Sequence, residues 1–161
     1  MAKATFAAGC YWGVEAEFRR LPGVTATRVG FIGGASAAPS YRDVCSGGTG
    51  HAEAVEVEFD PEAVTYDQLL EQFWDIHNPT TPDRQGWDVG DQYRSAIFTH
   101  SEEQEAQARA SFAEQDASGR FRDPIVTEIV AASAFTPAHE DHQRYLEKRG
   151  MVPKSMLSAA G

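Results

Sequence analysis

Apolar and small residues gather into runs that divide the first half of the chain into strands and a helix. The runs Thr5–Ala8, Val24–Ile32 and Ala52–Phe59 are short and either continuously apolar or alternate apolar with polar positions, which predicts three strands. Between the first two, Cys10–Arg20 carries apolar residues at helical spacing and predicts a partly buried helix. The stretch Gly33–Gly50 is rich in Gly, Ser, Ala and Pro and predicts a long loop.

Capping signals mark two helices in the second half of the chain. Thr65 and Gln68 form a capping box, and the apolar positions that follow keep a helical stripe as far as His77. Ser101 and Gln104 have the same spacing at the start of another helix. This second helix is predicted to end near Gly119. Before it, the sequence predicts an irregular stretch over Asn78–Gln92 and a strand over Tyr93–Thr99. After it come a strand over Ile125–Ala131 and a last helix over about Ala138–Arg149.

The order of these elements predicts the fold class. Read along the chain they run β-α-β-β-α-β and then α-β-α, which is a split βαβ (ferredoxin-like) core with an extension. We therefore expect an α+β two-layer sandwich with a mostly antiparallel sheet and long loops that form the site. A chain of 161 residues without linkers or repeats is expected to be one domain, with an irregular tail over about 150–161.

Composition and charge exclude several classes of partner. The net charge of -10 would repel nucleic acid phosphates and acidic membrane surfaces, and no basic stripe offsets it. No run approaches the ~18 apolar residues of a spanning helix, and no cleavage-site pattern follows the N-terminal stretch, so a cytoplasmic protein is expected. Two cysteines are too few for a disulfide framework, so any reactive role must come from a single thiol in a reducing compartment.

Cys10 lies between two glycines where a strand gives way to a helix. Backbone N–H groups and the helix dipole at such a position favour the thiolate, which is the nucleophilic form. Gly9 and Gly13 leave room for another molecule, and Tyr11 and Trp12 place large aromatic rings beside the sulfur. The alternative is a buried, inert cysteine, which is the commonest fate of a free thiol.

Two further residues carry possible chemistry near the predicted third strand. Cys45 lies in the long loop and could be a resolving thiol, a second nucleophile or a packing residue, of which packing is the default. Strand alternation puts Glu53 on the same face as Val55 and Val57. A carboxyl in an apolar place has a raised pKa and can act as a general acid, whereas one at an open strand end stays in water.

The histidines suggest only weak alternatives. His51 or His77 could serve as the base of a Cys–His acyl hydrolase. His139 and His142 have the spacing of half a metal site, but no other Cys or His at ligand spacing accompanies them, so a solvated helix face is expected and no metal. No Gly-rich phosphate cradle follows a strand, and no cofactor is expected.

Five separated blocks closely resemble the methionine sulfoxide reductase A family, in the family's order. They are Gly9–Gly13, Arg28–Gly34, Tyr41–Glu53, Pro79–Thr81 with Arg84–Gly86, and Gln92–Ser95. His142, Gln143 and Tyr145 near the end also fit, so the resemblance covers nearly the whole chain.

The resemblance implies an activity and a set of site residues. It implies that Cys10 attacks the sulfur of methionine S-sulfoxide and becomes a sulfenic acid, and that Glu53 protonates the departing oxygen. It further implies hydroxyl help from Tyr41 and Tyr93, a methyl pocket made by Tyr11 and Trp12, and ordering of water or substrate by Asp88. The substrate would be oxidised protein or free methionine sulfoxide, and the protein is expected to be a monomer.

Three departures from the family pattern bear on this interpretation. Tyr11 replaces the more usual Phe, and Asn78 stands where Asp is common. The segment Leu146–Gly161 has no cysteine, so an external thiol is expected to reduce Cys10: thioredoxin, or glutathione with glutaredoxin. Besides the hydrolase, a redox sensor or sulfoxide-binding module without turnover is the rival class.

Overall fold

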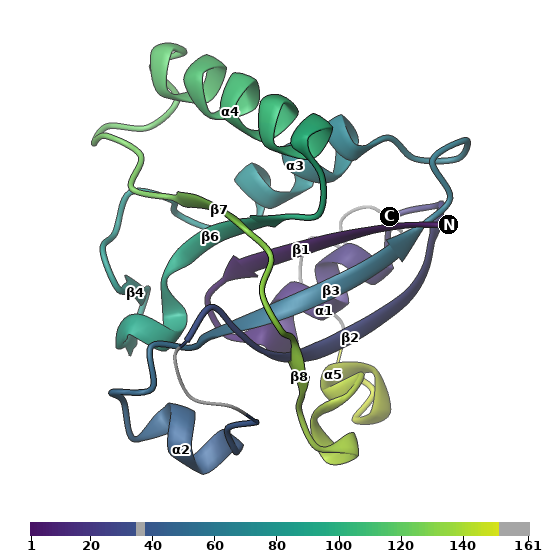
Figure 1. Cartoon of the computed structure of the whole chain (residues 1–161), viewed down its shortest axis with the longest axis vertical. Helices are drawn as coiled ribbons and strands as arrows, with labels where there is room; N and C mark the ends of the chain where they lie inside the picture. Colours follow the sequence, from purple (N-terminus) through teal and green to yellow (C-terminus); the bar gives the residue numbers. More distant parts are fainter. Residues whose placement is uncertain (35–37, 152–161) are drawn as a thin grey trace.

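A six-stranded mixed sheet forms the centre of the molecule. The computed structural model describes residues 1–34 and 38–151, and its strand order is β7-β6-β1-β3-β2-β8 (Figure 1). The strands are β1 (Ala2–Ala8), β2 (Val24–Ile32), β3 (Ala52–Phe59), β6 (Ser95–Thr99), β7 (Glu128–Ala131) and β8 (Thr136–Pro137). All neighbours are antiparallel except β6 and β7. The central order β6-β1-β3-β2 is that of a split βαβ unit, so the predicted α+β fold is confirmed.

Helices and a small hairpin connect these strands. The helices are α1 (Tyr11–Arg19), α2 (Tyr41–Cys45), α3 (Tyr66–Asp75), α4 (Glu102–Ala117) and α5 (Tyr145–Lys148), with 3-10 turns η1 (Asp91–Tyr93) and η2 (Glu140–His142). The hairpin pairs β4 (Arg84–Gln85) with β5 (Asp88–Val89). The bounds predicted for β2 and β3 match the observed strands to the residue.

The main core lies between one face of the sheet and helices α1 and α3. Phe6 of β1 is fully buried, stacks on Phe18 of α1 at 4.9 Å between ring centroids and contacts Phe73 of α3 at 5.4 Å. The opposite face carries a smaller cluster, and the chain that leads from β7 to β8 crosses it (Figure 1). Helix α4 packs on α3, where Trp74 Nε1 donates to Ser111 Oγ at 2.8 Å.

Strand register brings three separate segments to the end of β1. Phe6 pairs with Val55 of β3, so the same antiparallel register sets Glu53 level with the end of β1. On the other side of β1, Ala8 pairs with Ser95 of β6. Two residues beyond this pair lie Cys10, which follows β1, and Tyr93, which precedes β6. The reacting residues expected from sequence therefore converge here.

The predicted last helix over about 138–149 is wrong, because tertiary contacts break it. Residues 136–137 add an edge strand to β2, and Arg144 adopts a left-handed backbone with φ of 51°. Between them the buried Gln143 amide bonds to the backbone of β2, which a continuous helix would not allow. Only the short α5 follows, and the expected tail from 152 onward lies outside the described residues.

Smaller differences concern strand starts and caps. Tyr93 lies in η1 rather than in the strand, and β7 begins three residues after Ile125, whose N–H bonds to a helix carboxylate instead of the sheet. Ser101 caps α4, because its hydroxyl accepts from Gln104 N. The Gln104 side chain accepts from His100 N instead of Ser101 N, so the capping box is not closed. The predicted Gly33–Gly50 loop contains α2, which a box formed by Ser40 with Asp43 begins.

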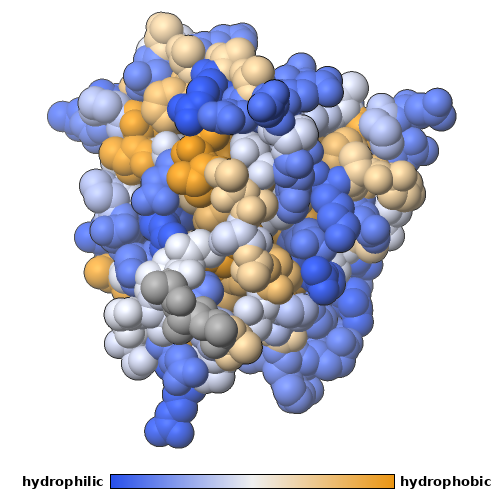
Figure 2. Space-filling model, viewed as in Figure 1, coloured by the Kyte–Doolittle hydropathy of each residue, from blue (hydrophilic) through white to orange (hydrophobic). Residues whose placement is uncertain are grey.

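The face of the molecule seen in Figure 2 is mostly hydrophilic, with small and separate hydrophobic patches. Apolar side chains are thus concentrated in the core. Among the helices formed by residues 1–34 and 38–151, none has the length and apolar character needed to cross a membrane.

Candidate active site

Cys10 occupies the N-cap of α1 and is partly exposed. Gly9 before it has φ of 100°, a conformation that side chains disfavour, and an added Cβ would lie 2.9 Å from Gln85. Gln85 is itself fixed, because it accepts from Asn78 N at 2.9 Å and donates to Asn78 O at 2.7 Å. The β4-β5 hairpin is therefore docked directly against the residue that precedes the thiol.

The thiol of Cys10 is protonated in the free protein at neutral pH, contrary to the expectation of a stabilised thiolate. Burial raises its pKa to about 11, and the negative charges of Glu53 and Asp88 act in the same direction. The backbone N–H groups of Trp12 and Gly13 favour the thiolate, as predicted for a helix start, but their effect is smaller than that of burial. Deprotonation therefore has to be coupled to another step.

Glu53 is the buried carboxyl of the site, with 1% of its surface exposed. Its Oε1 accepts from Tyr11 N at 3.2 Å, while Oε2 is buried and has no hydrogen-bond partner among the described residues. Burial raises its pKa to about 7, with a smaller contribution from the charge of Asp88. Glu53 can therefore hold a proton near neutral pH and present it from an oxygen that nothing else occupies.

An aromatic cluster covers the start of α1. Tyr11 is buried, and its Oη lies 2.9 Å from His142 Nδ1; Trp12 Nε1 donates to the same nitrogen at 3.3 Å. Trp12 stacks on Tyr145 with ring centroids 3.8 Å apart, and Tyr41 lies 4.5 Å from the His142 ring. The two aromatic residues beside Cys10 are thus held by residues from the far end of the chain.

Two further tyrosines border the site. Burial raises the pKa of Tyr93 to about 12, and the charges of Glu53 and Cys10 contribute. Burial also raises the pKa of Tyr41, which hydrogen-bonds Cys45 and responds to Glu53 and Tyr93. Both hydroxyls therefore stay protonated at neutral pH and are available as donors.

Cys45 is exposed, at the end of α2, so the expectation that it is a packing residue is wrong. Its neighbour Val44 fills the core position instead, with 1% of its surface exposed. Asp88 lies in β5 and is exposed, but its charge raises the pKa of both Cys10 and Glu53. The hairpin therefore contributes a negative charge that acts on both Cys10 and Glu53.

The two histidines considered as bases are used elsewhere. His77 is bonded on both ring nitrogens, to Phe73 O at 2.7 Å and Ser95 Oγ at 2.8 Å, and burial lowers its pKa to about 4. His51 is buried, and its Nδ1 accepts from Gly34 N at 3.2 Å. Across the described ranges, no group of three or more His, Cys, Asp and Glu could hold a metal ion.

Sequence reasoning missed the place of His142. The pair with His139 suggested a solvated helix face, and His139 is indeed exposed, but His142 bonds to Tyr11 across 131 positions of sequence. The only available signal was its membership of the final block that resembles the family.

Comparisons with known proteins point to one family. The family model described as peptide methionine sulfoxide reductase matches residues 2–160. Peptide methionine sulfoxide reductase MsrA of Methanoculleus marisnigri is 59% identical over 150 residues, covering 93% of this chain and 92% of that protein.

Solved structures give the same result. Methionine sulfoxide reductase A of Corynebacterium diphtheriae is 41% identical with a TM-score of 0.85, covering 92% of this chain and 74% of that one. Mxr1 of Saccharomyces cerevisiae in reduced form is 33% identical with a TM-score of 0.87, covering 92% and 86%; Mxr1 has also been solved in complex with Trx2. A match over nearly its full length, by family model, sequence and structure, means that this chain belongs to the peptide methionine sulfoxide reductase family of oxidoreductases.

Proposed function

We propose that this enzyme reduces the S epimer of methionine sulfoxide with Cys10 as nucleophile and Glu53 as proton donor. The observation that carries the proposal is the buried Glu53 carboxyl, with one unpartnered oxygen and a pKa of about 7, beside a thiol at a helix start. A sulfoxide oxygen gains basicity as its bond to sulfur breaks, so it needs a donor in this place. Neither a hydrolase nor a passive redox sensor needs such an acid.

The reaction balances with the single proton that Cys10 and Glu53 hold between them. The Cys10 thiolate attacks the sulfoxide sulfur, and Glu53 gives its proton to the oxygen. The S–O bond of the substrate then breaks as the oxygen passes to Cys10, which leaves methionine, a Cys10 sulfenic acid and the Glu53 carboxylate. Because the form of the pair that holds one proton is mostly thiol and carboxylate, the reactive form arises when that proton moves from Cys10 to Glu53.

The other site residues have supporting roles in this proposal. Tyr41 and Tyr93 donate hydrogen bonds to the oxygen, because their raised pKa values keep both hydroxyls protonated. The rings of Tyr11 and Trp12 receive the S-methyl group, and Asp88 orders water or the polar part of the substrate. The substrate is methionine sulfoxide in oxidised protein or as the free amino acid.

We further propose that an external thiol recycles the enzyme. The described residues include only two cysteines, and both are free. Thioredoxin, or glutathione with glutaredoxin, would attack the sulfenic acid directly; the complex of yeast Mxr1 with Trx2 makes thioredoxin the first choice to test. The exposed Cys45 is the internal alternative. Free cysteines also suit a cytoplasmic enzyme, and we propose that residues 1–161 act as one catalytic domain and as a monomer.

The test is release of methionine from each sulfoxide epimer, as free amino acid and within a peptide, with dithiothreitol as reductant. We expect turnover with the S epimer alone. Reduction of the R epimer at a similar rate, or of neither epimer, contradicts the proposal.

A further inference from the structure

Two adjacent residues near the C-terminal end are fastened to the body of the enzyme. The buried Gln143 amide accepts from Val29 N at 2.8 Å and donates to Val29 O at 2.9 Å and Ala138 O at 3.0 Å. The N–H of Arg144 donates to Glu15 Oε1 at 2.6 Å. Residues 143 and 144 are thereby tied to β2 and α1, respectively.

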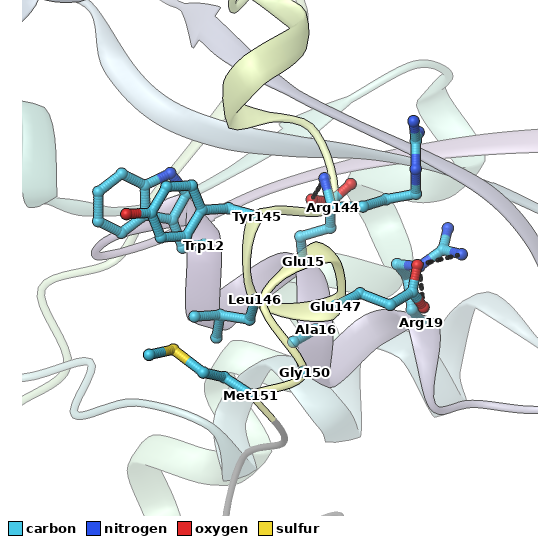
Figure 3. Close-up of a pocket in the computed structure, with 10 residues that line it drawn as sticks. All are labelled: Trp12, Glu15, Ala16, Arg19, Arg144, Tyr145, Leu146, Glu147, Gly150 and Met151. Carbon is cyan, nitrogen blue, oxygen red and sulfur yellow. Dashed lines mark hydrogen bonds and ion pairs between the residues drawn. The ribbon is translucent and has the colours of Figure 1, made fainter.

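Glu15 is a buried carboxylate that the reaction does not use. It has 1% of its surface exposed, and its second oxygen accepts from Thr27 Oγ1 at 2.7 Å. Figure 3 shows it lying under the C-terminal turn, with its bond to Arg144 dashed. Burying a carboxylate is costly unless hydrogen bonds compensate, so both of its bonds are needed to keep it in place.

The residues on either side of this fastening reach the active site. His142 Nδ1 lies 2.9 Å from Tyr11 Oη and 3.3 Å from Trp12 Nε1. An indole N–H can only donate, so this nitrogen is an acceptor and the Tyr11 hydroxyl also donates to it. Tyr145 stacks on the Trp12 ring, with the planes 6° apart (Figure 3).

Packing between α1 and this segment is incomplete. A pocket of about 140 Å³ lies beside the Trp12–Tyr145 stack, and its lining includes Ala16 of α1 together with Leu146 and Met151 (Figure 3). The exposed ion pair between Arg19 and Glu147 adds little, because water screens it. The position of His142 therefore depends on the buried hydrogen bonds of Gln143 and Arg144.

We propose that Glu15 and Gln143 are positioning residues that fasten the C-terminal segment so that His142 and Tyr145 hold Tyr11 and Trp12 beside Cys10. Neither residue touches the reacting atoms. Their effect passes through the backbone of residues 143 and 144 to His142, and from there to the two aromatic rings. The part of this inference that concerns substrate binding rests on the proposed function, whereas the fastening of the segment does not.

The first test compares Glu15→Ala with Glu15→Gln, whose amide oxygen can still accept from Arg144 N. Loss of a hydrogen bond to a charged group should raise the KM for methionine S-sulfoxide roughly tenfold in the alanine variant. The kcat should stay within about twofold, and Cys10 should alkylate with iodoacetamide at the wild-type rate, because the thiol itself is untouched. The glutamine variant should keep the wild-type KM.

The second test does not depend on activity. The indole N–H of Trp12, assigned in a ¹H–¹⁵N spectrum by its loss in Trp12→Phe, should exchange with solvent roughly tenfold faster in Glu15→Ala than in wild type or Glu15→Gln. Gln143→Met keeps the side-chain length without the three bonds and should give the same two effects if Glu15→Ala fails to fold. If wild type reduces neither epimer the proposed function fails, yet this exchange still tests the fastening.

A folded Glu15→Ala or Gln143→Met protein with wild-type KM overturns the inference, whether or not the indole exchange changes. Unchanged exchange in both variants overturns it as well, because His142 would then hold Trp12 without its anchors.

Discussion

Cys10 lies at the start of α1 within the candidate site, and its thiol has a raised pKa because it is buried. We predict that Cys10→Ser has no measurable sulfoxide reduction, since a hydroxyl stays protonated and forms no stable sulfur–oxygen intermediate. Methionine release by this variant with Cys45 intact would falsify the role of Cys10. Cys45→Ser is the matched control and should keep the first turnover.

The pKa values of about 7 for Glu53 and about 11 for Cys10 predict a pH profile. Below pH 7 the pair holds two protons, and between the two values it holds the one proton that the reaction uses. The kcat/KM for a neutral sulfoxide should therefore rise as pH passes through about 7 and then level off. A profile that falls through this range contradicts the shared-proton mechanism.

Glu53→Gln removes the acid and should lower turnover by on the order of 10²-fold or more. The rise near pH 7 should disappear with it, because no group in the pair then titrates there. The variant should still fold, since the amide can accept the bond from Tyr11 N. A folded Glu53→Gln enzyme with near wild-type rates would make Glu53 structural.

At the scale of elements, β2 and β8 approach each other closely at Gly30. An added Cβ would collide with Thr136 O and lie 2.8 Å from the Phe135 ring, although Gly30 has no left-handed backbone. We predict that Gly30→Ala lowers the free energy of unfolding by about 1–3 kcal/mol through steric overlap.

Gly13 in α1 is the control for that substitution, because its Cβ would meet nothing within 4 Å. Gly13→Ala should raise the free energy of unfolding by about 0.5–1 kcal/mol through helix propensity. Urea unfolding of both variants measures the difference, and equal stabilities would contradict the close approach of β8.

Local signals explain which elements the sequence could predict. Strands β2 and β3 are short runs in which apolar and polar positions alternate, bounded by Gly, Pro or Asp, and α3 has a complete capping box with an apolar stripe, so their places follow from neighbours in sequence. The segment after Ala138 depends instead on Gln143 and Glu15, whose partners are 114 and 129 positions away. No periodicity within the segment reports such contacts.

The features of the site can likewise be divided into those that local sequence predicts and those that depend on the assembled fold. Cys10 and Glu53 stand in motifs whose strand and helix context is local, and the resemblance to the family supplied roles for the tyrosines. The raised pKa of Cys10 could not be predicted, because it depends on burial by the assembled fold and on the charges of Glu53 and Asp88. The exposure of Cys45 could not be predicted either, because it depends on the short helix α2, which lies within the stretch predicted to be a loop.

At the scale of the whole molecule, the oxidised enzyme can be recycled either by an external thiol or by its own Cys45. We predict that one equivalent of methionine sulfoxide without reductant leaves a sulfenic acid at Cys10 and a free thiol at Cys45, detected by intact and peptide mass spectrometry. The exposed Cys45 would have to bring its Cα within ~7 Å of that of Cys10 to form a disulfide. An internal disulfide that disappears in Cys45→Ser would replace the external route.

The outer edge of β2 has a consequence for how this protein behaves among damaged chains. Strand β8 covers it for two residues, one of them Pro137, and the Gln143 amide takes up both the N–H and the C=O of Val29. An unfolded polypeptide that arrives at residues 29–31 finds this stretch of the edge already paired and cannot add a strand there. For the oxidised proteins proposed above as substrates, this part of the sheet edge therefore offers no place for strand addition.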